Sequence, residues 1–167
     1  MSNRLIALHA LLATASVSTG TAALAQTAER GCIELKTVAE IQEAYVDERG
    51  NAATRLVPAA KVVPGDEVIW TIVANNVCTT PAGDIAITNP VPSHMRYVGS
   101  SAFGPGANIE FSLDGSTFAV PEALVVAAAD GSRRPARADE YLAIRWVLSQ
   151  PMGPSESWIV RYRATVL

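Results

Sequence analysis

Residues 64–99 read PGDEVIWTIVANNVCTTPAGDIAITNPVPSHMRYVG, and this stretch is the most informative part of the sequence. It opens with a Pro-Gly-Asp turn, because proline presets φ and glycine accepts positive φ. An alternating strand follows, whose apolar side consists of Val68, Trp70, Ile72 and Ala74. After a second turn, a strand with Ile85 and Ile87 stops at Asn-Pro-Val-Pro, since proline cannot donate to a strand ladder.

Strand signals continue on both sides of this stretch, and helix signals are nearly absent. Residues 33–41 predict a half-buried strand with Ile33, Leu35, Thr37, Ala39 and Ile41 on its inner face. The alternation slips near residues 43–44, where we expect a bulge. A turn at 47–51 leads into a returning strand at 52–57, and short strands are expected at 95–98 and 109–113. Residues 121–129 read as a strand or as a single helical turn.

The last two strands predict most of the remaining core. Between them lies a turn at residues 150–154, and their inward residues are Leu142, Ile144, Trp146, Leu148, Trp158, Val160, Tyr162, Ala164 and Val166. We expect one buried cluster between two sheets, made of Trp70, Ile72, Ile144, Trp146, Val160 and Tyr162. Eight or nine short strands at this spacing predict an antiparallel all-β sandwich.

The motif in residues 64–99 resembles the DUF11 repeat domain of bacterial surface and envelope proteins, here in a single copy. The shared features are the PGD turn, an aromatic strand ending in Asn, an Asp/Asn-Pro-x-Pro step and a Tyr-Val pair. The likeness is strong over 64–99 and loose over the rest of 32–167. It implies an immunoglobulin-like β-sandwich without enzymatic chemistry. Related domains often carry Asp where this chain has Asn89, which weakens any carboxylate-based role at that position.

The first 25 residues predict a signal peptide. Arg4 supplies a positive start, an apolar run begins at Leu5, and Ala-Leu-Ala at 23–25 is a small-x-small cleavage site. The alternative is an uncleaved anchor, but the run is shorter than the roughly 20 residues that a membrane helix needs. We therefore expect a signal peptide at 1–25, a short segment at 26–31 and one domain at 32–167. The mature protein would begin at Gln26, be periplasmic or secreted, and have no membrane span.

Charge argues against nucleic acid as a partner. Without Arg4 the chain has 12 basic residues against 16 acidic ones, a net charge of −4. Binding to nucleic acid needs a concentrated basic footprint, which this balance does not offer. The expected partner is instead an envelope or surface protein.

Three arginines form a candidate interaction loop: Arg133, Arg134 and Arg137. They follow an Asp-Gly turn and would suit an acidic partner. Asp130, Asp139 and Glu140 bracket them and would neutralise much of their field. A solvated loop is therefore the favoured interpretation.

Cys32 and Cys78 are a candidate disulfide, because paired cysteines are common in exported proteins. If the strand that begins near Cys32 pairs antiparallel with the strand that ends near Asn75, both sulfurs lie at the same end of the sandwich. If residues 32–46 and 52–60 instead form an intervening hairpin, Cys32 lies at the opposite end and the two thiols stay apart. The sequence leaves both topologies open.

No catalytic residue, cofactor-binding residue or metal site is predicted. His94 is the one histidine after the signal peptide and lies in a loop without a partner base or nucleophile. No serine has a Gly-x-Ser-x-Gly context. Three classes of function remain: a structural or protein-interaction module of the envelope, a carbohydrate- or ligand-binding receptor domain, and an assembly subunit that polymerises by edge-strand addition.

Overall fold

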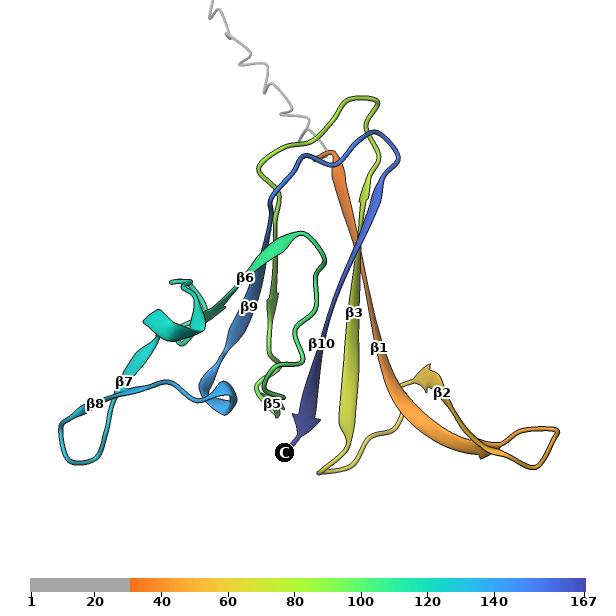
Figure 1. The fold of residues 1–167 in the computed structure, drawn as a ribbon, viewed down its shortest axis with the longest axis horizontal. Helices are drawn as coiled ribbons and strands as arrows, with labels where there is room; N and C mark the ends of the chain where they lie inside the picture. Colours follow the sequence, from red (N-terminus) through yellow and green to blue (C-terminus); the bar gives the residue numbers. More distant parts are fainter. Residues whose placement is uncertain (1–30) are drawn as a thin grey trace, which may run out of the picture. The chain divides into compact units, whose positions relative to one another are not determined.

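The computed structural model describes residues 31–167, which fold into antiparallel β-sheets (Figure 1). The predicted signal peptide and its cleavage site lie outside the described residues. In chain order the elements are β1 (Ile33–Val46), β2 (Ala52–Pro58), β3 (Glu67–Asn76), β4 (Ala86–Pro90), β5 (Met95–Tyr97), β6 (Ala107–Ser112), η1 (Pro121–Ala123), β7 (Val125–Ala127), β8 (Arg133–Pro135), η2 (Ala138–Glu140), β9 (Ala143–Leu148) and β10 (Ser157–Val166).

Two sheets enclose the core, which confirms the predicted all-β sandwich. The larger sheet has the strand order β2-β1-β3-β10-β5, and the smaller has the order β4-β9-β6. β7 and β8 form a separate hairpin. All pairings are antiparallel, and the turns that the sequence marks at 64–66 and 47–51 are present. Residues 121–129 contain both alternatives, the helical turn η1 and then β7.

The predicted core cluster lies between the two sheets. Ile72, Ile144, Trp146, Val160 and Tyr162 are fully buried, and Trp70 packs against them while partly exposed. The rings of Trp70 and Tyr162 are stacked with their centroids 6.2 Å apart. Asn89 on β4 donates its side-chain amide to the Tyr162 hydroxyl at 2.7 Å, so a hydrogen bond joins the two sheets.

β1 changes partner halfway along its length. It pairs with β3 from Ile33 to Glu40 and with β2 from Glu40 to Val46. The β1–β2 register is unbroken, so the predicted bulge at 43–44 is wrong. Residues 40–58 form a hairpin, the β1–β2 arm, that extends away from the sandwich in Figure 1. Because no second sheet covers this arm, the inward-outward alternation is not required there, and Val46 is 69% exposed.

The path of β1 explains how Cys32 and Cys78 come to lie at the same end of the sandwich. Ile33 lies opposite Asn76, so the start of β1 meets the end of β3. Cys32 and Cys78 form a disulfide with their Cα atoms 5.1 Å apart. β1 is long enough to pair with β3 first and to form the hairpin afterwards, so the two alternatives were not exclusive.

Two leucines that were predicted to face inward are half exposed. Leu35 lies opposite Ala74 and so shares its inner face, yet it is 54% exposed, because the smaller sheet does not cover β1. Leu142 is 52% exposed and lies one residue before β9, where the alternation of that strand has not yet begun.

Candidate functional site

A groove with a volume of about 580 Å³ lies beside the first half of β10. We call it the β10 groove. It is lined by Phe103, Pro105, Glu156, Ser157, Trp158, Ile159 and Arg161. Two smaller hollows lie between the sheets at their two lateral sides, with volumes of about 330 and 400 Å³.

The groove exists because β10 pairs with other strands along only part of the edge that faces away from β3. On its other side β10 pairs with β3 over nearly its whole length. On the groove side β5 pairs with residues 164–166, and Phe103 and Arg161 then exchange two backbone hydrogen bonds of 2.7 and 2.8 Å. The chain leaves β10 after Phe103. Since alternate residues of a strand point their backbone groups to the same side, Ile159 directs its N–H and C=O into the groove, as Arg161 does toward Phe103.

Glycines at 104 and 106 bring the chain close to two tryptophans. A Cβ atom on Gly104 would lie 2.5 Å from Cδ1 of Trp146, and one on Gly106 would lie 3.0 Å from Cη2 of Trp158. Gly106 also has a φ of 72°, a backbone conformation that residues with a side chain rarely adopt. Residues 104–106 therefore form a fixed wall of the groove.

Trp158 was predicted to be a core residue; it packs against the core, but it is partly exposed and also lines the groove. Its indole N–H donates to the Glu156 carboxylate at 3.0 Å. The backbone N–H of Gly153 donates to the same carboxylate at 2.6 Å, and these bonds lower the pKa of Glu156, with that of Gly153 the larger cause. Phe103 is 58% exposed and Ile159 is 47% exposed. The groove thus offers an apolar, partly aromatic surface beside a free stretch of backbone.

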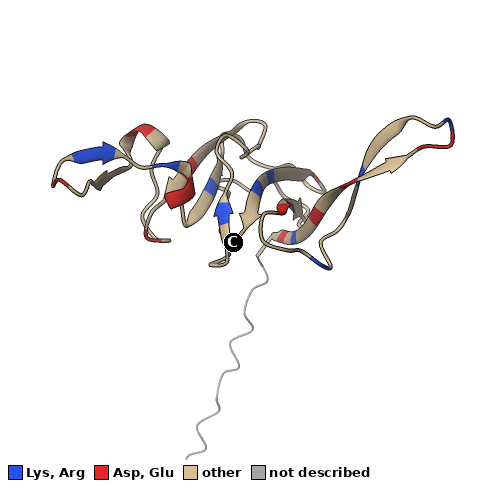
Figure 2. Cartoon of the chain, turned by 90° about the horizontal axis from the view of Figure 1, so that it is seen from below, with Lys and Arg blue, Asp and Glu red and all other residues tan. Residues whose placement is uncertain are grey.

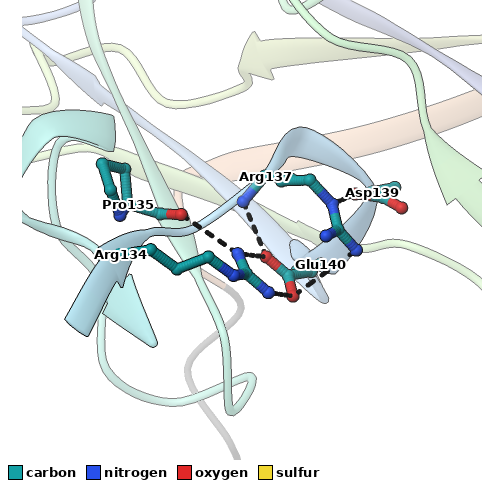
Figure 3. Close-up of polar contacts among 5 residues, drawn as sticks. All are labelled: Arg134, Pro135, Arg137, Asp139 and Glu140. Atoms are coloured by element: carbon teal, nitrogen blue, oxygen red, sulfur yellow. Dashed lines mark hydrogen bonds and ion pairs between the residues drawn. The ribbon is translucent and has the colours of Figure 1, made fainter. Parts of the chain in front are cut away.

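The predicted arginine loop is a short hairpin with internal ion pairs. Arg133 and Arg134 belong to β8, which pairs with β7, so the expectation of an irregular loop is wrong there. Arg134 donates two hydrogen bonds to Glu140, at 2.6 and 2.7 Å. The backbone N–H of Arg137 donates to Glu140 at 2.7 Å, and its guanidinium donates to Asp139 at 3.0 Å (Figure 3).

These bonds reduce the charge that the arginines offer to a partner. The hydrogen bonds from Arg134, and next the one from the backbone of Arg137, lower the pKa of Glu140 to about 2. Arg133 makes no ion pair within residues 31–167. Figure 2 shows basic and acidic segments interleaved along the ribbon, with both signs at this hairpin and at the tip of the β1–β2 arm. The arginine hairpin is therefore a weaker candidate than the β10 groove.

The remaining candidates do not come together. His94 is exposed in the turn before β5. Among the described residues, no three His, Cys, Asp or Glu side chains are grouped as metal ligands would be. Within residues 31–167 no helix has the length and apolar character needed to cross a membrane.

Comparison with protein-family models, curated proteins and solved structures gives no match. The fold defines the class as an antiparallel all-β sandwich with one disulfide. The resemblance of residues 64–99 to DUF11 stays a prediction from the sequence.

Proposed function

We propose that this chain is an exported, non-enzymatic β-sandwich module of the DUF11 type, which binds a protein partner in the bacterial cell envelope through the β10 groove. The observation that carries this proposal is the groove itself, with its exposed aromatic ring and its free strand edge. The disulfide supports export, because disulfides persist in oxidising compartments such as the periplasm or the cell exterior.

The groove suits an extended segment of a partner protein. Such a segment would add beside residues 157–159 and exchange backbone hydrogen bonds with Ile159, while its side chains rest on Phe103 and Trp158. Aromatic residues and arginine are the types enriched at the centres of protein interfaces. Arg161 lies at one end of the groove, where its Nε donates to the Thr71 hydroxyl at 3.0 Å and so has a fixed position.

Trp158 favours a second candidate function, a carbohydrate-binding receptor domain. A partly exposed indole held in place by Glu156 presents an apolar ring with a polar rim. Sugar rings stack on such surfaces, and the groove has room for a small oligosaccharide. The predicted third class, polymerisation by edge-strand addition, would use the same free edge of β10 with a further copy as the partner.

The test compares three forms of residues 26–167 as bait for envelope proteins: the wild type, Phe103→Ser and Leu142→Ser. Leu142 is the matched control, because it is equally exposed but does not line the groove. We expect wild type and Leu142→Ser to capture the same partner and Phe103→Ser to bind it roughly tenfold more weakly. Equal capture by all three forms would contradict the proposal. Glycan binding that is lost in Trp158→Ala, without protein capture, would favour the receptor function.

A further inference from the structure

β1 has a free edge over its first half, before its pairing with β2 begins. Pairing with β2 begins only at Glu40, and no described strand pairs with the preceding residues on that side. The carbonyl of Cys32 accepts from Val77 on the β3 side, and the carbonyl of Ala39 accepts from Ala59 on the β2 side. Since backbone groups alternate along a strand, residues 33, 35 and 37 point their N–H and C=O groups toward the free edge.

An apolar notch lies under this edge. Its volume is about 400 Å³, and its walls include Ile33 and Leu35 of β1 and Ile85 and Ile87 beside or on β4. Leu35 projects toward it from the inner face of the sheet and is 54% exposed. An exposed leucine beside unpaired backbone groups favours pairing with a further strand. Natural edge strands usually avoid this combination.

The opposite face of the same stretch carries two exposed charges of opposite sign, Glu34 and Lys36. Neither makes an ion pair with another residue of the described chain. They are separated by one residue, so an antiparallel strand centred on the residue between them would place each charge opposite its counterpart. The stretch is thus complementary to itself.

We propose that the free edge of β1 pairs antiparallel with the same edge of a second copy of this chain, in a register centred on Leu35. Leu35 then lies opposite Leu35 of the second copy, and Ile33 lies opposite Thr37. Residues 33, 35 and 37 of both copies exchange backbone hydrogen bonds. Glu34 faces Lys36 twice, at the positions where paired side chains come closest, with Cα atoms about 4.5 Å apart.

The register follows from charge. Moving the second copy by two residues in either direction keeps the backbone groups facing each other. One such shift places Glu34 opposite Glu34, and the other places Lys36 opposite Lys36. Like charges directly opposite each other destabilise a strand pair, whereas opposite charges stabilise it. Centring on Leu35 is therefore the favoured pairing.

Space and burial agree with this register. The free edge ends at Ala39, where Ala59 occupies the neighbouring place, so only about five residues of a second strand fit beside β1. Paired residues of adjacent strands point to the same face, so Leu35 of the second copy projects toward the notch. The association buries the two exposed leucines and satisfies the unpaired backbone groups of both copies.

Sedimentation equilibrium of residues 26–167 tests this pairing, with the disulfide formed. We expect a dimer for the wild type. Glu34→Lys and Lys36→Glu each place like charges opposite each other and should weaken dimerisation roughly tenfold or more. The double variant Glu34→Lys/Lys36→Glu restores both ion pairs and should dimerise again. An equimolar mixture of the two single variants should form a heterodimer for the same reason.

Two controls separate this result from others. Glu122→Lys reverses an exposed charge on η1 and should leave the dimer unchanged. Because all these side chains are exposed, every variant should melt near the wild-type temperature when its dimerisation is taken into account. A wild-type chain that stays monomeric up to ~1 mM would overturn the proposal. A dimer that survives the single reversals, or that the double variant fails to restore, would overturn it as well. The proposal does not rest on the β10 groove, and Phe103→Ser should remain dimeric.

Discussion

The two lateral sides of the sandwich are built differently. On the side of β5 and β6, three aromatic rings, Tyr97, Phe111 and Tyr141, are buried together with centroids 4.4 to 5.9 Å apart. On the side of β1 and β4, no aromatic ring of the described residues lines the space between the sheets, and Leu35 is half exposed above a notch. Buried rings line the hollow of about 330 Å³ on the aromatic side, whereas the other side, which we call the incomplete side, leaves a leucine half exposed at a notch of about 400 Å³.

The edges of the strands differ in the same way. On the aromatic side, β5 is only three residues long, and Phe111 of the other edge strand, β6, already exchanges two backbone hydrogen bonds with Ala119, so both offer little backbone for pairing. The first half of β1 offers three consecutive alternate residues with free backbone groups and a self-complementary charge pattern. The incomplete side, and not the aromatic side, is therefore where pairing with another copy of this chain is favoured.

The largest effect should come from breaking the aromatic side. Phe111→Ala removes a ring that contacts both Tyr97 and Tyr141, and we expect the free energy of unfolding to fall by about 3–5 kcal/mol. Phe103→Ala is the matched control, since Phe103 is 58% exposed and its loss should cost less than about 1 kcal/mol. Urea denaturation measures both. Equal losses in the two variants would mean that the aromatic side does not stabilise the sandwich as described.

Removing the disulfide should have the next largest effect, on the incomplete side. The Cys32→Ser/Cys78→Ser double variant loses a link across a sequence separation of 46 residues. A stability loss of about 2–4 kcal/mol is expected, since the chain-entropy relation gives about 4 kcal/mol for a loop of this length. Denaturation midpoints of the oxidised wild type and the double variant provide the measurement. A difference below about 1 kcal/mol would contradict the view that the bridge holds β1 against β3.

Acid should have a smaller effect, at the arginine hairpin. The folded chain lowers the pKa of Glu140 from its ordinary value of 4.5 to about 2, so the charged form contributes stability above pH 4.5. That contribution is lost as the pH falls from 4.5 to about 2. Glu140→Gln should therefore lose stability less steeply over this range than the wild type does. Denaturation at several pH values checks this, with Glu122→Gln on η1 as the control that should follow the wild-type curve.

The core was predictable from the sequence because it depends on strict alternation. Ile72, Trp146 and Tyr162 lie in long strands that have a sheet on one face, and each is buried as the pattern indicates. Leu35 follows the same alternation and still ends up exposed. Its exposure depends on how many strands the opposite sheet has, which no local pattern encodes.

The β10 groove was missed for a related reason. Trp158 is in phase with the core, and its partial exposure comes from the chain leaving β10 after Phe103. The signal that was available is the Gly-Pro-Gly sequence at 104–106, which predicts a tight turn close to bulky side chains. The arginine hairpin shows the opposite case: Asp139 and Glu140, which follow it closely in sequence, do pair with Arg137 and Arg134, whereas Asp130 accepts from Ser132 instead.

Amide hydrogen exchange along β1 is a direct test of whether its free edge pairs with a second copy. The N–H groups of Glu34 and Lys36 face β3 and should be protected at every protein concentration. Those of Leu35 and Thr37 face the free edge and should be protected only in the dimer. We expect slow exchange at all of these positions in concentrated protein, and a fast-slow alternation on dilution or in Glu34→Lys. Fast exchange of Leu35 and Thr37 at every concentration would contradict the proposed pairing.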